Sequence, residues 1–131
     1  MLKITKVSIL YLFLTSITYA QPITENSLSG QWTGTTTAPS TGNELQIRVN
    51  LLENKSTWTY FTPITGPRNP CFDREFPITI KGLAENKFSF NVDGTSTLNG
   101  CPKFTLIVER VDEKTLNGTF IDGRKAILKR K

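Results

Sequence analysis

The chain has 131 residues, of which 16 are basic and 11 acidic, and it contains two cysteines and no histidine. The missing histidine excludes Ser-His-Asp and Cys-His catalysis and the usual zinc sites. A chain of this length forms one domain with a modest hydrophobic core.

Residues 1–20 have the pattern of a secretory signal peptide. Two lysines precede an apolar stretch, Val7–Leu14, and the small residues Thr18 and Ala20 stand where a signal peptidase cleaves. The alternative is an N-terminal membrane anchor, but a span of the hydrocarbon core needs about 20 apolar residues. We therefore predict a signal peptide at 1–20 and a single mature domain at 21–131. The expected location is secreted or periplasmic, with no membrane span after cleavage.

After residue 20, apolar and polar residues alternate with a period of two between turn residues, which predicts short β-strands. In chain order the expected strands are Gln31–Thr37, Glu44–Leu52, Ser56–Thr62, Pro77–Gly82, Lys87–Val92, Lys103–Val111, Thr115–Ile121 and Lys125–Lys129. Short connections favour an antiparallel meander, and closure into a barrel removes its exposed edges. We predict an all-β fold, an eight-stranded antiparallel up-and-down barrel. A β-sandwich is the alternative, although it needs longer crossover connections.

The two cysteines lie in predicted loops, Cys71 after the third strand and Cys101 after the fifth. An even number of cysteines in an exported chain favours a disulfide. Closing a loop of about 30 residues stabilises a fold by roughly 3 to 4 kcal/mol. A metal site would need further soft ligands besides the two thiols. We therefore predict one disulfide, between Cys71 and Cys101, and no metal site.

The charged residues point to no catalytic site. The carboxylates are spread over turns, and the pair Asp73 and Glu75, flanked by Arg68 and Arg74, suits solvated ion pairs better than a glycosidase pair. We expect no enzyme activity, no catalytic residues and no cofactor.

The basic residues do not form an obvious nucleic-acid interface. Five of them lie in the last eight residues, and the rest of the mature chain is nearly neutral. A solubilising terminus is the simplest interpretation of this tail, with contact to acidic polymers or an anionic membrane surface as the alternative. An oligonucleotide-binding barrel would need exposed aromatics on a basic groove. Phe88 and Phe90 instead alternate with polar residues, as core residues do. No nucleic-acid partner is expected.

Three short motifs are shared with a known family. They are LSGQWTG at residues 28–34, TYFT at residues 59–62 and FSFNV at residues 88–92. Together they resemble the avidin and streptavidin family, and the likeness covers most of residues 28–131. The resemblance implies an avidin- or lipocalin-like barrel. It also implies a disulfide between Cys71 and Cys101, because members of the bacterial branch link the loop before strand four to the loop after strand five.

The binding residues of that family are only partly present. The resemblance assigns Tyr60 and Thr62 to the pair that holds the biotin ureido oxygen. Gly34 stands where a polar ligand, usually Asn, is expected, and Gly94 stands where a tryptophan wall is expected. The tryptophan of strand seven and the acidic or amide ligand of strand eight have no counterpart either. Each missing hydrogen-bond partner costs on the order of 1 to 3 kcal/mol, so we expect weak or no biotin binding.

The preferred hypothesis is an exported barrel that binds a small hydrophobic or heterocyclic ligand in an altered pocket. The candidate ligand-binding residues are Tyr60, Thr62, Trp58, Thr36, Gly34 and Phe90. The alternative is a protein-interaction module, such as an enzyme inhibitor with a protein partner. An open cavity of about 300 Å³ at the interior positions would favour the ligand. A filled interior with an exposed apolar patch at a loop end would favour a protein partner.

Overall fold

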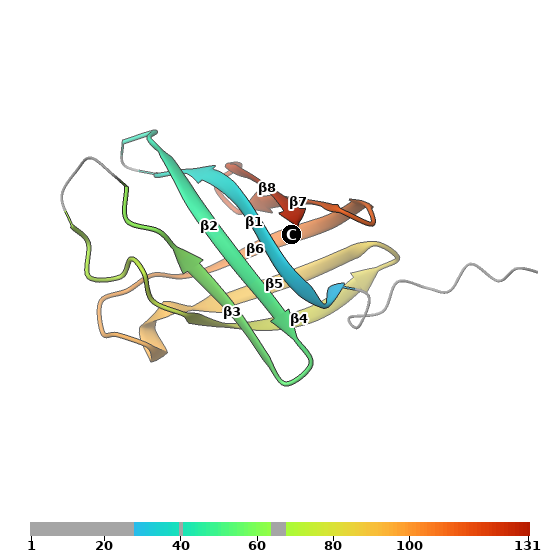
Figure 1. Cartoon of the computed structure of the whole chain (residues 1–131), viewed down its shortest axis with the longest axis horizontal. Helices are drawn as coiled ribbons and strands as arrows, with labels where there is room; N and C mark the ends of the chain where they lie inside the picture. Colours follow the sequence, from blue (N-terminus) through green and yellow to red (C-terminus); the bar gives the residue numbers. More distant parts are fainter. Residues whose placement is uncertain (1–27, 40, 64–67) are drawn as a thin grey trace, which may run out of the picture.

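The computed structural model describes residues 28–39, 41–63 and 68–131, which form one closed sheet (Figure 1). The expected signal peptide, residues 1–20, and the first residues of the mature domain lie outside the described residues. The strands are β1 (Gly30–Thr37), β2 (Glu44–Leu52), β3 (Lys55–Tyr60), β4 (Phe76–Ala84), β5 (Lys87–Asp93), β6 (Lys103–Asp112), β7 (Thr115–Phe120) and β8 (Lys125–Arg130), with a short 3₁₀ helix, η2 (Gly94–Ser96), after β5.

Each strand pairs antiparallel with its neighbour in the sequence, and β1 pairs with β8 to close the sheet. The predicted eight-stranded antiparallel up-and-down barrel is therefore confirmed, as is the disulfide between Cys71 and Cys101. Within the described part of the chain, no helix is long and apolar enough to cross a membrane.

The third strand is shorter at its end than the alternation predicts. β3 ends at Tyr60, two residues before the expected end at Thr62. The amide of Phe61 still donates a hydrogen bond to the Gln46 carbonyl of β2, at 3.0 Å. Beyond that bond the chain leaves the sheet, because the backbone and hydroxyl of Thr62 both bond to Asp73 in the following loop.

The core follows the period of two in most strands, although Thr57 to Tyr60 of β3 are all buried. In β2, for example, Leu45, Ile47, Val49 and Leu51 are each no more than 7% exposed, whereas the side chains between them are exposed or half-buried. Such alternation places one set of side chains inside the barrel and the other on its surface. The apolar residues thus fill the interior.

One end of the barrel is closed by Trp32, and we call this end the base. Trp32 is fully buried, and its indole N–H donates to the Leu28 carbonyl at 2.8 Å. The guanidinium of Arg130 lies 4.4 Å from the Trp32 ring and donates to the carbonyls of Ser29 and Glu113. The two carbonyls fix the Arg130 guanidinium, and its stacking on the ring helps to hold Trp32 at this end of the barrel.

The contact between β3 and β4 is the least extensive in the sheet. Only two residue pairs join them, Thr57 with Pro77 and Trp58 with Phe76. From Ile78 to Ala84, β4 pairs with β5 alone. A hollow of about 300 Å³ lies where the two strands diverge, between the β2–β3 turn and Ile78 to Ile80.

Candidate functional site

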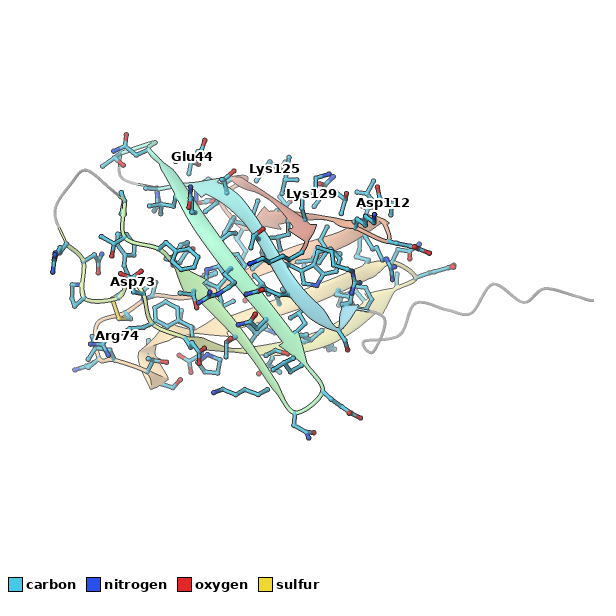
Figure 2. All side chains as sticks on the ribbon, viewed as in Figure 1. Glu44, Asp73, Arg74, Asp112, Lys125 and Lys129 are labelled. Carbon is cyan, nitrogen blue, oxygen red and sulfur yellow. A yellow bond between two sulfur atoms is a disulfide. The ribbon has the colours of Figure 1, made fainter. Side chains whose placement is uncertain are left out.

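The longer loops gather at the end opposite the base, which we call the mouth. The loops that join β1 to β2, β3 to β4, β5 to β6 and β7 to β8 all lie there, at the left of Figure 1. The disulfide links the β3–β4 loop to the β5–β6 loop, with 5.5 Å between the Cα atoms of Cys71 and Cys101. Figure 2 shows Asp73 and Arg74 beside it. Of the two barrel ends, the mouth therefore carries the longer loops, and the disulfide fixes two of them to each other.

Five aromatic side chains fill the interior below the mouth, and we call them the mouth cluster. They are Trp58, Tyr60, Phe72, Phe104 and Phe120. The ring of Trp58 meets those of Tyr60, Phe104 and Phe120 edge-to-face, at centroid distances of 5.6, 5.4 and 6.1 Å. Edge-to-face pairs of this kind add about 0.5 to 1.5 kcal/mol each beyond the area they bury.

Two of these aromatics could have been found from the sequence. Phe104 continues the alternation of Leu106 and Val108 in β6, and Phe120 continues that of Leu116 in β7. The third residue missing from the prediction, Phe72, lies in the β3–β4 loop, where no periodicity marks it. It reaches the cluster because the disulfide at Cys71 and the bond from the Asp73 amide to the Tyr60 carbonyl fix the loop on both sides.

The indole N–H of Trp58 is buried and makes no hydrogen bond of normal geometry, although its contact with the Tyr60 hydroxyl lowers the pKa of that group. The side chain is fully buried, so no solvent reaches the donor. In folded proteins nearly all buried polar groups are paired, and an exception calls for an explanation. The indole of Trp32 at the base, by contrast, is paired with the Leu28 carbonyl.

The hydroxyl of Tyr60 remains protonated at physiological pH. Burial raises its pKa to about 12, against smaller lowering effects from the charge of Arg124 and from a side-chain hydrogen bond with Trp58, and with a further raising effect from Asp122. The side chain is 8% exposed. Tyr60 therefore presents a neutral O–H group above Trp58 at every pH at which the protein would operate.

Arg124 lies at the rim of the mouth cluster, in the β7–β8 turn. Its guanidinium lies 4.3 Å from the centre of the Phe120 ring. It also donates to the Asp122 carboxylate at 2.7 Å and to the Thr37 carbonyl at 2.6 Å. These three contacts fix a positive charge close enough to Tyr60 to lower its pKa.

Thr62 is held by Asp73 rather than by the barrel interior. The Thr62 hydroxyl and amide both donate to the Asp73 carboxylate, and the amide bond is 3.2 Å long. These two bonds hold the pKa of Asp73 below its ordinary value. A hollow of about 500 Å³ opens beside them, lined also by Phe72 and by Arg68 to Pro70. The structure thus separates Thr62 from its expected partner Tyr60.

The two candidate residues of β1 take part in closing the sheet. A Cβ atom on Gly34 would lie 1.9 Å from the Ile127 carbonyl oxygen of β8, so only glycine allows this approach. The hydroxyl of Thr36 donates to the Lys125 carbonyl, at 3.0 Å. Both residues therefore contact the β8 backbone.

The remaining interior positions are filled. Phe90 is fully buried in the core. At Gly94, a Cβ atom would lie 2.4 Å from the Pro102 carbonyl oxygen and 3.0 Å from the Phe76 ring, so no larger side chain fits there. Among the candidate residues, the structure brings Trp58 and Tyr60 together at the mouth and places Phe90 in the packed core.

The aspartates with altered pKa values are turn residues. Asp112 and Asp122 are exposed and Asp93 is half-buried, and hydrogen bonds from neighbouring residues of their own turns lower the pKa of each. They remain ionised near neutral pH and stabilise the turns. Within residues 28–39, 41–63 and 68–131, no three His, Cys, Asp or Glu side chains form a group that could hold a metal ion.

A scan against protein-family models found no match for this chain, and searches of curated proteins and of solved structures found none either.

Proposed function

We propose that this protein is an exported barrel that binds a small, flat hydrophobic or heterocyclic ligand at the mouth. The observation that carries the proposal is the hollow of about 500 Å³ at the mouth, which lies beside Phe72 of the mouth cluster, the same cluster that holds Trp58 and Tyr60. Binding sites for small molecules combine apolar and aromatic walls with a few polar groups that fix orientation. The mouth cluster supplies the walls, and Tyr60 and the side chains that line the hollow supply the polar groups.

Biotin is not the expected ligand. Gly34 lies against the β8 backbone, where a polar side chain would clash, and the Thr62 hydroxyl already donates to Asp73. Gly94 leaves no room for an aromatic wall. A ligand that needs these three contacts would lose hydrogen bonds worth on the order of 1 to 3 kcal/mol each.

The proposal is tested by thermal denaturation in the presence of a panel of planar heterocycles that includes biotin. A ligand at 100 times its Kd stabilises a protein by about 2.7 kcal/mol, which raises the melting temperature by several degrees for a domain of this size. We expect at least one heterocycle to do so and biotin to leave the melting temperature unchanged. Tyr60→Phe should weaken the response, whereas Thr79→Val, on the exposed face of β4, should not.

Export is tested by determining the N-terminus of the protein recovered outside the cytoplasm. We expect the chain to begin at Gln21, because Thr18 and Ala20 satisfy the specificity of signal peptidase. Recovery of the intact chain, residues 1–131, in the membrane fraction would instead support an N-terminal anchor.

A protein partner is the second candidate function, and the filled interior of the barrel together with one exposed side chain at the mouth favours it. Ile121, in the β7–β8 turn at the mouth, is 88% exposed. Large exposed apolar side chains are common at protein interfaces when they belong to a patch. If no compound of the panel raised the melting temperature, and Ile121→Ser abolished a defined complex seen with the exported protein, the interaction module would be favoured over the ligand-binding barrel.

A further inference from the structure

We infer that the hollow at the mouth takes a zwitterion, a small molecule in which a flat ring carries one cationic and one anionic group, as in an aromatic amino acid. The ring contacts Phe72, the cationic group binds the Asp73 carboxylate, and the anionic group binds the Arg68 guanidinium. All three residues line the hollow of about 500 Å³. This inference rests on the proposed function and names the chemical class of its ligand.

The first step is the pair of opposite charges on the wall of the hollow. Two hydrogen bonds from Thr62 and, after these, the charge of Arg68 hold the pKa of Asp73 below its ordinary value, so both charges are present at neutral pH. Among residues 28–39, 41–63 and 68–131, Arg68 and Asp73 form no ion pair with each other or with another side chain. A ligand with both charges satisfies both groups, whereas a ligand with one charge is attracted by one group and repelled by the other.

The second step is the fixed position of the carboxylate. The Asp73 amide donates to the Tyr60 carbonyl at 2.7 Å, and the carboxylate accepts bonds from the amide and the hydroxyl of Thr62. The backbone of Asp73 has a φ of 60°, in the left-handed region that aspartate tolerates. An ionised carboxylate accepts about four hydrogen bonds, so this exposed group keeps acceptor positions for a ligand. An ammonium group meets an acceptor that is already in place.

The third step is the donor side of the hollow. The guanidinium of Arg68 is exposed, and its planar donors can hold a carboxylate through two parallel bonds. Next to it, the Asn69 side-chain oxygen accepts from the Cys71 amide at 2.8 Å. The N–H₂ end of the Asn69 side chain therefore remains a donor, and no described residue accepts from it. One charged and one neutral donor thus suit an anionic oxygen acceptor.

The fourth step is the aromatic wall. Phe72 is half-buried, with its ring centroid 6.3 Å from that of Tyr60 and the planes at 56°. The disulfide at the preceding residue, Cys71, and the Asp73 bonds hold the loop on both sides of the ring. Because part of the ring is accessible, a flat ring of the ligand can cover it in an offset or edge-to-face contact.

The experiment compares three probes that share a phenyl ring and differ in charge: phenylalanine, 3-phenylpropanoate, which lacks the ammonium group, and 2-phenylethylamine, which lacks the carboxylate. Binding to the mature protein is followed in a ¹H–¹⁵N correlation spectrum. We expect phenylalanine to shift the amide signals of Phe72 and Asp73 and to bind at least about threefold more tightly than either analogue, as for exposed charge pairs. The preference should shrink at high salt. The indole signal of Trp32, bonded to Leu28 at the base, is the internal control and should stay in place.

Two variants give a crossed pattern that a loss of structure cannot imitate. Arg68→Gln should weaken phenylalanine and 3-phenylpropanoate by about threefold or more and leave 2-phenylethylamine unchanged or tighter. Asp73→Asn should weaken phenylalanine and 2-phenylethylamine and leave 3-phenylpropanoate unchanged or tighter. A disordered loop would weaken all three probes alike. Lys81→Gln, at an exposed position of β4, changes the net charge as Arg68→Gln does and should leave all three affinities unchanged.

The ring contact has its own variant. Phe72→Ala should weaken all three probes, because each loses the same aromatic wall. Circular dichroism of every variant checks that the barrel is retained.

The outcomes separate this inference from the proposed function. If either analogue bound as tightly as phenylalanine, or if a heterocycle bound at the mouth and no zwitterion did, the zwitterion would be the wrong class and the ligand-binding barrel would stand. Equal effects of Arg68→Gln and Lys81→Gln would also overturn the inference. Failure of every heterocycle and every probe to bind would overturn both.

Discussion

Gly34 is kept as glycine by the backbone of the neighbouring strand. The resemblance to the avidin family implies that a ligand contact is lost at this residue, but in the structure Gly34 lies directly against the Ile127 backbone of β8. Restoring a polar side chain there would separate the strands rather than rebuild a binding site. The same physical reason, close contact with a backbone carbonyl, excludes a tryptophan at Gly94.

Replacing Gly34 with alanine should destabilise the protein strongly. The added Cβ would lie 1.9 Å from the Ile127 carbonyl oxygen, and an overpacked site of this kind costs about 1 to 3 kcal/mol. Gly82→Ala is the matched control, because nothing lies within 4 Å of the added atom. Urea denaturation should give a clearly lower free energy of unfolding for Gly34→Ala and a change near zero for Gly82→Ala. Equal values for the two variants would contradict the packing at the β1–β8 contact.

Tyr60 makes the stability of the protein depend on pH in the alkaline range. It is the only tyrosine between residues 21 and 131. Its pKa is about 12 in the folded protein and 10.0 when exposed, so between these values the unfolded chain loses a proton that the folded one keeps. The contribution of Tyr60 to the free energy of unfolding is therefore fully present below pH 10 and is lost as the pH rises toward 12.

The titration of Tyr60 can be followed by its absorbance at about 295 nm in the chain that begins at Gln21. We expect a midpoint near 12 in buffer and near 10 in denaturant, as for an exposed tyrosine. The alkaline loss of stability should be smaller in Tyr60→Phe. The loss that remains in this variant measures the contribution of other groups, such as the lysines. A midpoint near 10 in the folded protein would place the Tyr60 hydroxyl in water.

The strands and loops contribute unequally to the rigidity of the barrel. β3 and β4 share two residue pairs, whereas β5 and β6 share seven. The disulfide holds the mouth end of this same region, since Cys71 lies in the β3–β4 loop. The disulfide thus ties the β3–β4 loop to the β5–β6 loop at the mouth, whereas the unpaired part of β4 lies beside the β2–β3 turn at the base.

Hydrogen exchange should locate the weak pairing directly. From Ile78 to Ala84, every other amide of β4 points away from β5, toward the hollow beside β3. We expect these amides to exchange much faster than those of β6, which pairs on both sides. Protection equal to that of β6 along the whole of β4 would show that another segment covers this edge.

Removing the disulfide should destabilise the protein and loosen the mouth together. The two cysteines are 30 residues apart, and a loop of this length contributes about 3 to 4 kcal/mol in the chain-entropy model. The double variant Cys71→Ser, Cys101→Ser should lose that amount in guanidinium denaturation. It should also show faster amide exchange at Phe72 and Asp73, with little change in β1 and β8. A uniform change across the barrel would contradict a local role at the mouth.

For the whole molecule, the sequence was sufficient to predict the architecture but not the site. The alternation of apolar residues, the short turns and the two cysteines predicted the closed barrel and its disulfide, because each depends on local patterns. The end of β3 was missed because the side chain of Asp73, eleven residues away from Thr62, competes with the sheet for that residue. The burial of Trp58 beside Tyr60 and the close approach at Gly34 depend on three-dimensional packing, which no local pattern records.

The central claim is that the mouth, with Trp58 and Tyr60 at its floor, binds a small organic molecule. Native mass spectrometry of the mature protein purified from its source tests it most directly. We predict an added mass of a small organic compound on the wild-type chain, removed by unfolding and absent from Phe72→Ala purified in the same way. A chain that carries no added mass, and that no heterocycle or aromatic amino acid stabilises, would contradict the claim.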